Sequence, residues 1–225
     1  MKAKNRLKVN AKAGSPPEIV LYGDIGDTMF SDGITATEIS KALTIHRNAP
    51  EIHVRVNSAG GDVFEGLAIA NRFAAMKSKI VGFVDGYAAS IATVILMGMD
   101  KVFAFDSSLL MIHKPWAGQA GNADDLRELA VRLDQVETAM TAMYSKKMTL
   151  TPEALERHLR DETWYSGPEA LSVGLVDELV EGERIAASLD RQWFTNPPQT
   201  VLQPGRAAVK ARVERMRLHL SRGNV

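Results

Sequence analysis

The chain has 225 residues, of which 45% are hydrophobic and 24% charged, a composition typical of one main globular domain. It contains no cysteine, which excludes disulfides and thiolate metal sites. No segment has the pattern of a secretory leader, and the apolar run Ile91–Met99 is much shorter than the roughly 20 apolar residues of a membrane span. We therefore expect a cytoplasmic protein that does not enter a membrane.

The zero net charge conceals a difference between the ends of the chain and its middle. Residues 1–12 contain five basic and no acidic residues, and residues 206–225 contain six basic residues against Glu214 alone. Because each end contributes +5, the residues between them carry a net charge of −10. Basic ends can contact nucleic acid or an acidic partner, but they can equally be solvated tails that keep a protein soluble. We favour solvated tails and do not expect nucleic acid as a partner.

Strand and helix patterns alternate along the first half of the chain. The run Glu51–Asn57 alternates apolar and polar residues, as a half-buried strand does, and Thr35 with Glu38 has the spacing of a capping box at the start of a helix. Alternating elements of this kind predict an α/β core with parallel strand pairing. The strands are expected at Glu18–Tyr22, Glu51–Asn57, Lys79–Val84, Lys101–Phe105 and Leu109–His113, and the helices from Thr35, at Val63–Lys77 and at Tyr87–Met97.

The second half of the chain is mainly helical. The stretch from Asn122 to about Lys147 has no glycine or proline, and we expect this long helix to project from the core and pack on another subunit. Thr151 before Pro152 starts the next helix, and the run Ser166–Glu169 starts a third that ends before the predicted strand Val176–Val180.

The two ends of the chain are predicted to be extensions of the main domain. Residues 1–17 form a basic N-terminal extension, residues 18–182 the main domain and residues 183–225 a C-terminal extension. Within the last segment, residues 196–205 are polar and rich in proline, which predicts a linker. Beyond the linker, four apolar residues fall on one face of a basic helix: Val209, Val213, Met216 and Leu220.

Three short motifs in a fixed order contain the parts of an acyl-transfer site. They are Asn57-Ser58-Ala59-Gly60-Gly61-Asp62, Gly86-Tyr87-Ala88-Ala89-Ser90-Ile91 and Met111-Ile112-His113-Lys114-Pro115. The first offers a paired-glycine turn, the second a serine in the first turn of an apolar helix, and the third a histidine at a strand end. Hydrolysis by a serine needs a base, a group that holds the base, and N–H donors for the oxyanion, so each motif has a candidate role.

Each candidate also has a purely structural interpretation. Alone, Ser90 could be a small residue on a buried helix face, and His113 could be a structural histidine. The paired glycines strengthen the catalytic interpretation, because a backbone without Cβ atoms can approach an extended peptide closely and aim the N–H of Gly61, together with that of Ile91, at its carbonyl. Gly60 and Ala59 are the residues expected to bind the substrate backbone. The remaining histidines have no partner motif and are interpreted as structural: His46, His53, His158 and His219.

At these motifs the chain resembles the ClpP family of serine peptidases. That family carries an Asn-Ser-x-Gly-Gly turn, a Gly-x-Ala-Ala-Ser-hydrophobic helix start and a Met-Ile-His-x-Pro segment in this order. The similarity extends from about Glu18 to Asp177 and includes the family's Ser-x-x-Glu-Ala-x-x-x-Gly-Leu-Val-Asp pattern from Ser166 onward. The resemblance implies three roles: Ser90 as nucleophile, His113 as general base and then acid, and the N–H groups of Gly61 and Ile91 as the oxyanion hole.

The third member of the implied catalytic triad has two candidates. The family has an aspartate at this point, before an aromatic residue and the Ser-x-x-Glu-Ala pattern. Counting back from Ser166 without a gap selects Glu162, whereas identity with the family's aspartate favours Asp161. We favour Glu162. Either carboxylate can orient the imidazole and stabilise its cation, and the other then merely caps or solvates the loop.

The resemblance further implies the α/β spiral of ββα units that ClpP shares with crotonases. It implies a homo-oligomer of stacked, heptameric rings, with the Asn122–Lys147 helix as the handle between rings, and it implies no cofactor or metal. The basic start of the chain lacks the family's axial-loop sequence, which counts against docking to an AAA+ unfoldase. The Asp161–Trp164 variant, the loop at Trp116 and the C-terminal tail are more similar to ClpP-like proteases encoded with phage head genes, which process capsid or scaffold proteins.

Other functions stay open at this point. One is a housekeeping proteolytic subunit of an ATP-dependent Clp protease. Another is a crotonase-fold acyl-CoA hydratase or isomerase, which also uses paired N–H donors but performs its chemistry with carboxylates, so Ser90 and His113 favour the peptidase. A third is a non-catalytic ring or assembly factor that keeps the fold for interactions alone.

Overall fold

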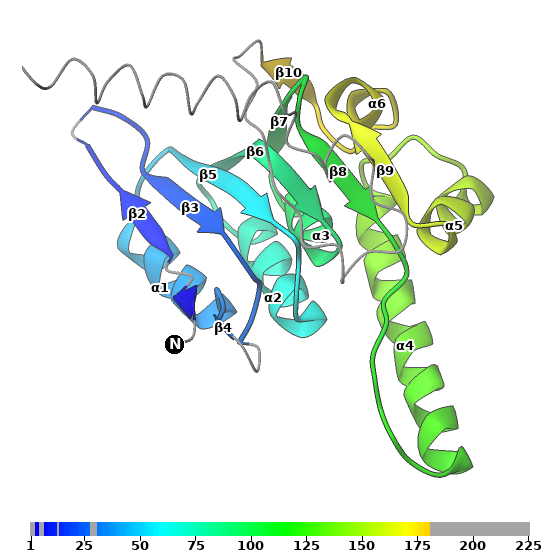
Figure 1. The fold of residues 1–225 in the computed structure, drawn as a ribbon. Coiled ribbons are helices and arrows are strands. Elements are labelled where there is room, and N and C mark those ends of the chain that lie inside the picture. The colour runs from blue at the N-terminus through cyan, green and yellow to red at the C-terminus, as the bar shows by residue number, and fades with distance from the viewer. Residues whose placement is uncertain (1–2, 5–6, 13, 28–30, 181–225) are drawn as a thin grey trace, which may run out of the picture. The chain divides into compact units, whose positions relative to one another are not determined.

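The computed structural model describes residues 3–4, 7–12, 14–27 and 31–180 (Figure 1). The helices are α1 Ala36–Ile45, α2 Val63–Ala74, α3 Ile91–Met97, α4 Ala123–Tyr144, α5 Pro152–Arg160 and α6 Gly167–Ser172. The strands are β1 Ala3–Lys4, β2 Lys8–Asn10, β3 Glu18–Tyr22, β4 Ser31–Asp32, β5 Glu51–Ser58, β6 Lys79–Ala89, β7 Lys101–Phe105, β8 Leu109–Ile112, β9 Thr163–Ser166 and β10 Glu178–Val180. The predicted C-terminal extension, with its linker, its basic helix and His219, lies outside the described residues.

Eight strands form one mixed sheet, in which the order of six is β10-β7-β6-β5-β3-β2. All neighbours in this row pair in parallel except β2, which is antiparallel to β3. The long strand β6 pairs with β7 along its first half and with β8 along its second half, and β9 runs antiparallel to β8. The predicted α/β class with parallel pairing is confirmed. The sheet branches at β6, and this branch brings the ends of β5, β6 and β8 together.

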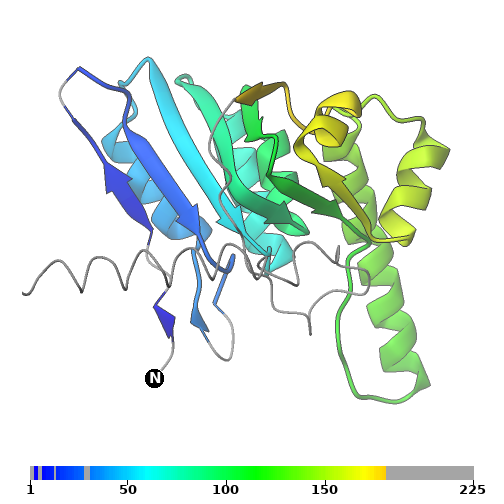
Figure 2. The ribbon, with the colours of Figure 1, turned by 45° about the horizontal axis from the view of Figure 1, so that its top comes forward.

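Three helices, α1, α2 and α3, lie against the same face of the sheet, as both views show (Figure 1 and Figure 2). The residues of β5 that were predicted to face inward, Ile52, Val54 and Val56, are all buried in the core between this face and the helices. Gly66 sets the spacing of α2 and α3, because a Cβ atom there would lie 2.2 Å from the side chain of Ile91. The α2–α3 pair therefore fixes where the first residue of α3 sits.

The helix predicted at Tyr87–Met97 begins later in the structure, as α3. Residues Tyr87–Ala89 were predicted to be helical, but they continue β6 and pair in register with Leu109–Met111 of β8. Alanine and tyrosine occur in both helices and strands, so local propensity does not fix the conformation of this segment. Pairing with β8 makes it a strand. The helix begins only at Ile91, and Ser90 stands at the junction of strand and helix.

The long helix α4 begins at Asn122, whose side chain forms a capping box with Asp125. Only its last turn is buried, through Met140, Met143 and Tyr144, and the remainder extends beyond the sheet (Figure 1). The prediction that this helix projects is confirmed, whereas its packing on another subunit stays a prediction. Within the described ranges, no helix is long and apolar enough to cross a membrane.

Candidate active site

Ser90 occupies a sharp turn between β6 and α3, with φ 57° and ψ −132°. Its N–H donates to the carbonyl of Met111 at 2.9 Å, and its own carbonyl accepts from the N–H of Thr93 at 3.0 Å. A positive φ is costly for a residue with a Cβ atom, so these bonds on both sides hold a strained conformation. Ser90 was predicted to lie within the first helical turn, which was wrong: it is the N-cap residue, and its hydroxyl caps no helical N–H.

The hydroxyl of Ser90 is directed instead at His113. The distance between Ser90 Oγ and His113 Nε2 is 2.7 Å. This contact follows from the sheet, because Ala89 and Met111 are in register in the parallel strands β6 and β8, and each candidate residue comes just after its strand. The structure therefore brings together the serine and the histidine of two different sequence motifs.

His113 is half-buried, and two opposing influences act on its pKa. Burial, the stronger influence, lowers the pKa below the ordinary value because it disfavours the imidazolium, while the negative charge of Glu162 raises it in part. The net direction is downward. A lowered pKa favours the neutral imidazole, whose Nε2 can accept the proton of Ser90.

Glu162 is the carboxylate that lies beside His113. In the antiparallel pair of β8 and β9, Ile112 is opposite Thr163, which places Glu162 opposite His113 at the end of the ladder. Its side chain is 9% exposed, and its backbone adopts a φ of 50°. Asp161 is exposed and serves as the C-cap residue of α5, and of the two predicted acids Glu162 is the one whose charge acts on His113.

The indole of Trp164 also contacts this carboxylate, a role that the sequence analysis did not assign. Trp164 Nε1 donates to Glu162 Oε1 at 3.4 Å. Glu162 is a turn residue with a φ of 50° just before β9, so the two-residue periodicity of a strand does not predict this contact. That strand has only four residues and was not predicted.

The paired-glycine turn at the end of β5 lies directly against Ser90. A Cβ atom on Gly60, whose φ is 97°, would stand 2.8 Å from Ser90 Cβ and 3.2 Å from the nitrogen of Ile91. The neighbouring residues continue the arrangement: Ala59 is half-buried, and Gly61, with φ 146°, is exposed. Gly61 follows the glycine in this contact and Ile91 follows the serine, and their role as oxyanion donors stays a prediction.

Hydrogen bonds with Ile25 hold the turn in place. The N–H of Ile25 donates to the Gly60 carbonyl at 2.9 Å, and the N–H of Asp62 donates to the Ile25 carbonyl at 2.8 Å. Neither bond uses the N–H of Gly61. Asp62 then caps α2 by accepting from the N–H of Glu65.

Three other histidines lie within the described residues. His46 ends α1, His53 bonds Glu51 on β5 and His158 bonds the hydroxyl of Tyr165. These partners agree with the structural roles predicted for them.

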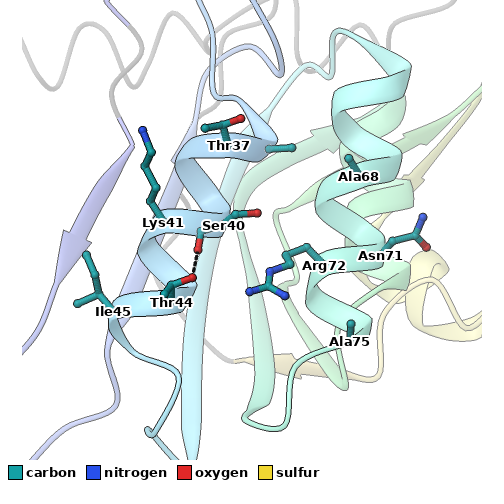
Figure 3. A pocket seen from close by; sticks show the side chains of 10 residues that line it. Thr37, Ser40, Lys41, Thr44, Ile45, Ala68, Asn71, Arg72 and Ala75 are labelled. Atoms are coloured by element: carbon teal, nitrogen blue, oxygen red, sulfur yellow. Dashed lines mark hydrogen bonds between the residues drawn. The ribbon is translucent and has the colours of Figure 1, made fainter.

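A surface groove lies between α1 and α2 (Figure 3). It has a volume of about 910 Å³ and is lined by side chains such as Thr37, Lys41 and Ile45 of α1 and Asn71 and Arg72 of α2. None of the residues predicted for catalysis lines it. The groove therefore adds nothing to the chemistry at Ser90.

Serine hydrolases use the elements that meet here: a serine hydroxyl at a strand-to-helix turn, an imidazole within hydrogen-bond distance, a carboxylate beside that imidazole and a glycine turn against the serine. Comparison with known proteins narrows this class. The model of the Clp protease family matches residues 6–183, and the chain belongs to that family. This match confirms the resemblance to the ClpP family, and the mixed α/β fold is consistent with the ClpP fold. Membership of the family supports a protease.

Relatives in three bacteria are named as proteolytic subunits of the ATP-dependent Clp protease. The chain is 33% identical over 168 residues to the ATP-dependent Clp protease proteolytic subunit of Deinococcus radiodurans, with 74% of this chain and 81% of the relative covered. It is 31% identical over 158 residues to that of Porphyromonas gingivalis, with 68% and 71% covered. It is 30% identical over 186 residues to proteolytic subunit 1 of Streptomyces coelicolor, with 75% and 84% covered.

Proposed function

We propose that this protein is a serine endopeptidase that hydrolyses peptide bonds through an acyl-enzyme on Ser90. The observation that carries the proposal is the 2.7 Å separation of Ser90 Oγ from His113 Nε2 in a chain of the Clp protease family. Glu162 completes the triad, since it is the carboxylate whose charge acts on His113. Asp161 has no catalytic part in this proposal.

In the first half of the reaction, Ser90 Oγ attacks the peptide carbonyl carbon while His113 Nε2 takes the hydroxyl proton. The carbonyl oxygen becomes an oxyanion, which accepts hydrogen bonds from the N–H groups of Gly61 and Ile91. The C–N bond then breaks, and the leaving amine takes the proton from His113. The product of this half is an ester between Ser90 and the acyl part of the substrate.

In the second half, a water molecule gives a proton to His113 and its oxygen attacks the ester carbon. The ester bond breaks, the proton returns to Ser90 Oγ and the carboxylic acid product leaves. In both halves His113 is transiently a cation inside a half-buried site. The negative charge of Glu162 stabilises that cation, which is the work expected of the third residue.

The proposal includes an enclosing assembly, in which stacked rings of this chain surround the site and admit only polypeptide chains. Exposed Leu126 and Val131 on α4 support contacts between copies.

For substrates, we propose capsid or scaffold proteins of a phage head, on the basis of the Asp161–Trp164 variant and the Trp116 loop. The names of the relatives favour a second candidate, a proteolytic subunit that works with an ATPase.

A fluorophosphonate probe tests the core of the proposal. Mass spectrometry of the labelled protein is expected to place the adduct on Ser90, and Ser90→Ala is expected to abolish both labelling and peptide hydrolysis. Ser40→Ala is the matched control, since it removes a serine hydroxyl from the groove between α1 and α2. An unlabelled wild-type protein that binds an acyl-CoA would favour the hydratase or isomerase instead.

The same preparation tests the substrates. Incubation with phage head proteins and no nucleotide is expected to give defined cleavage products. Cleavage that requires an added ATPase and ATP would favour the second candidate.

A further inference from the structure

Two buried hydroxyl groups lie behind Ser90, and the mechanism above uses neither. Thr93 belongs to α3, Tyr144 is the last residue of α4, and both are 0% exposed. Thr93 Oγ1 lies 2.7 Å from Tyr144 Oη and 2.6 Å from the carbonyl oxygen of Ser90. The same Thr93 oxygen is 3.4 Å from the carbonyl oxygen of Met111.

The direction of these hydrogen bonds follows from the groups themselves. A carbonyl oxygen can only accept, so the Thr93 hydroxyl donates to Ser90. The carbonyl of Met111 can likewise only accept. The Tyr144 hydroxyl is therefore the partner that donates to Thr93 Oγ1. Burial raises the pKa of Tyr144, so the phenol keeps its proton throughout the neutral range. The result is a directed chain from the Tyr144 O–H through the Thr93 O–H to the Ser90 carbonyl.

This chain of hydrogen bonds ends on Ser90, whose backbone has a positive φ. Ser90 holds a φ of 57°, and its backbone is tied by Met111 on one side and by the N–H of Thr93 on the other. Met111 lies two residues before His113 on β8. Thr93 thus contacts the nucleophile's backbone and the strand that carries the base. Small displacements of reacting groups have large effects on rate, so a fixed Ser90 backbone matters for the distance to His113.

Filling the core does not require these two hydroxyls. Replacement of both partners of a buried hydrogen bond by apolar groups of the same shape is often nearly neutral for stability. Valine and phenylalanine have the shapes of Thr93 and Tyr144 without the hydroxyls. A change at both positions therefore separates packing from hydrogen bonding at this point of the core.

We propose that Thr93 and Tyr144 are positioning residues, which hold the backbone of Ser90 so that its hydroxyl stays within reach of His113. The inference rests on the proposed function, since it concerns the same nucleophile. Thr93 acts on Ser90 directly, and Tyr144 acts through Thr93. Neither residue touches the substrate.

The test is the rate at which a fluorophosphonate labels Ser90, together with kcat and KM for a peptide. Thr93→Val combined with Tyr144→Phe is expected to leave the melting temperature close to that of wild type. It is expected to slow labelling and lower kcat by roughly 10- to 100-fold, with KM nearly unchanged. Tyr165→Phe is the matched control, because it removes another buried tyrosine hydroxyl whose partner is His158 rather than Thr93.

Single changes add a second, independent reading. Thr93→Ser keeps the hydroxyl and is expected to label within a fewfold of the wild-type rate. Because Tyr144 acts through Thr93, Tyr144→Phe is expected to slow labelling in the wild-type background and to have no further effect once Thr93 is valine. Separate, additive losses would contradict the relay.

The outcomes distinguish this inference from the proposed function. A folded double variant that labels at the wild-type rate, beside a wild-type protein labelled on Ser90, overturns the positioning role and leaves the peptidase intact. A wild-type protein that is not labelled on Ser90 overturns the proposed function, and the positioning role with it.

Discussion

His113 stands between two groups that act in opposite directions on its pKa. Burial favours the neutral imidazole, which is the form that takes a proton from Ser90. Glu162 favours the cation, which is the form that must exist briefly after that transfer. The site therefore meets both requirements of a base that later becomes an acid, and at the residue scale the balance depends on one carboxylate.

The first prediction concerns that carboxylate. Glu162→Gln keeps the size of the side chain but removes its charge, and we expect a fall in kcat on the order of 10⁴-fold. Asp161→Asn is the matched control one residue away, and we expect a change of less than about twofold because Asp161 is exposed at the end of α5. Steady-state peptide hydrolysis measures both. Small and equal losses would mean that another group orients His113.

The second prediction is the pH dependence of Ser90 labelling by a fluorophosphonate. Only the neutral imidazole can accept the proton, so reactivity is present above the pKa of His113 and lost as the pH falls through it. Since burial lowers that pKa, the midpoint is expected below the ordinary value of 6.5. Glu162→Gln removes the charge that raises the pKa of His113. The fall in the residual reactivity on acidification is therefore expected at a still lower pH. A shift of that fall to higher pH would contradict the assigned electrostatics.

At the scale of elements, the sequence was informative where one short pattern determined one element. Alternation in Glu51–Asn57 predicted β5, and the Thr35–Glu38 capping box predicted the start of α1. Sequence patterns gave wrong or no predictions where pairing with a distant strand determines the structure. Tyr87–Ala89 form a strand because β8 lies beside them, and β9 is too short to show a periodic pattern. Local propensity cannot report a partner strand that arrives later in the chain.

The same limit applies to the site. The motifs predicted Ser90 and His113 as partners, and the structure places them 2.7 Å apart. Counting back from Ser166 favoured Glu162 over Asp161, but it could not give the register of β9 against β8, which places Glu162 at the level of His113. Thr93 and Tyr144 are 51 positions apart and meet only because α4 returns to the core beside α3. Such a pair has no signature in one sequence.

The third prediction concerns the turn between β5 and α2. Gly60→Ala would place a Cβ atom 2.8 Å from both Ser90 Cβ and the Ala89 carbonyl oxygen, at a φ of 97°. Strain and crowding together are expected to lower the free energy of unfolding by about 3 kcal/mol and kcat by at least about tenfold. Denaturant unfolding and peptide hydrolysis measure the two effects.

Gly118→Ala is the control for this prediction, since no atom lies within 4 Å of the Cβ it would add. It should change stability by less than about 0.5 kcal/mol. An active and stable Gly60→Ala protein would show that the turn does not press against the nucleophile.

At the scale of the whole molecule, α4 is the element whose surface is least explained by the single chain. It has 22 residues, but only its last turn is buried. Leu126 and Val131 are 46% and 56% exposed on the projecting part, where no described residue covers them. Exposed apolar side chains on a projecting helix favour association, because burial of each side chain contributes up to about 2 kcal/mol. A second copy of this chain is the partner that the proposed ring assembly supplies.

The fourth prediction follows from that surface. Replacement of Leu126 and Val131 by glutamate removes the apolar contacts and adds charge, and we expect the assembly to weaken on the order of a hundredfold. Gln135→Glu with Thr138→Glu adds the same charge to exposed polar positions of α4 and serves as the control. Sedimentation velocity over a range of concentrations measures the assembly, and circular dichroism checks that each subunit remains folded. Because Leu126 and Val131 lie on the exposed part of α4 and not at the buried end that carries Tyr144, fluorophosphonate labelling of the dissociated subunits separates loss of enclosure from loss of the site. Assemblies of unchanged stability in the Leu126 and Val131 variant would place the subunit contacts on another surface.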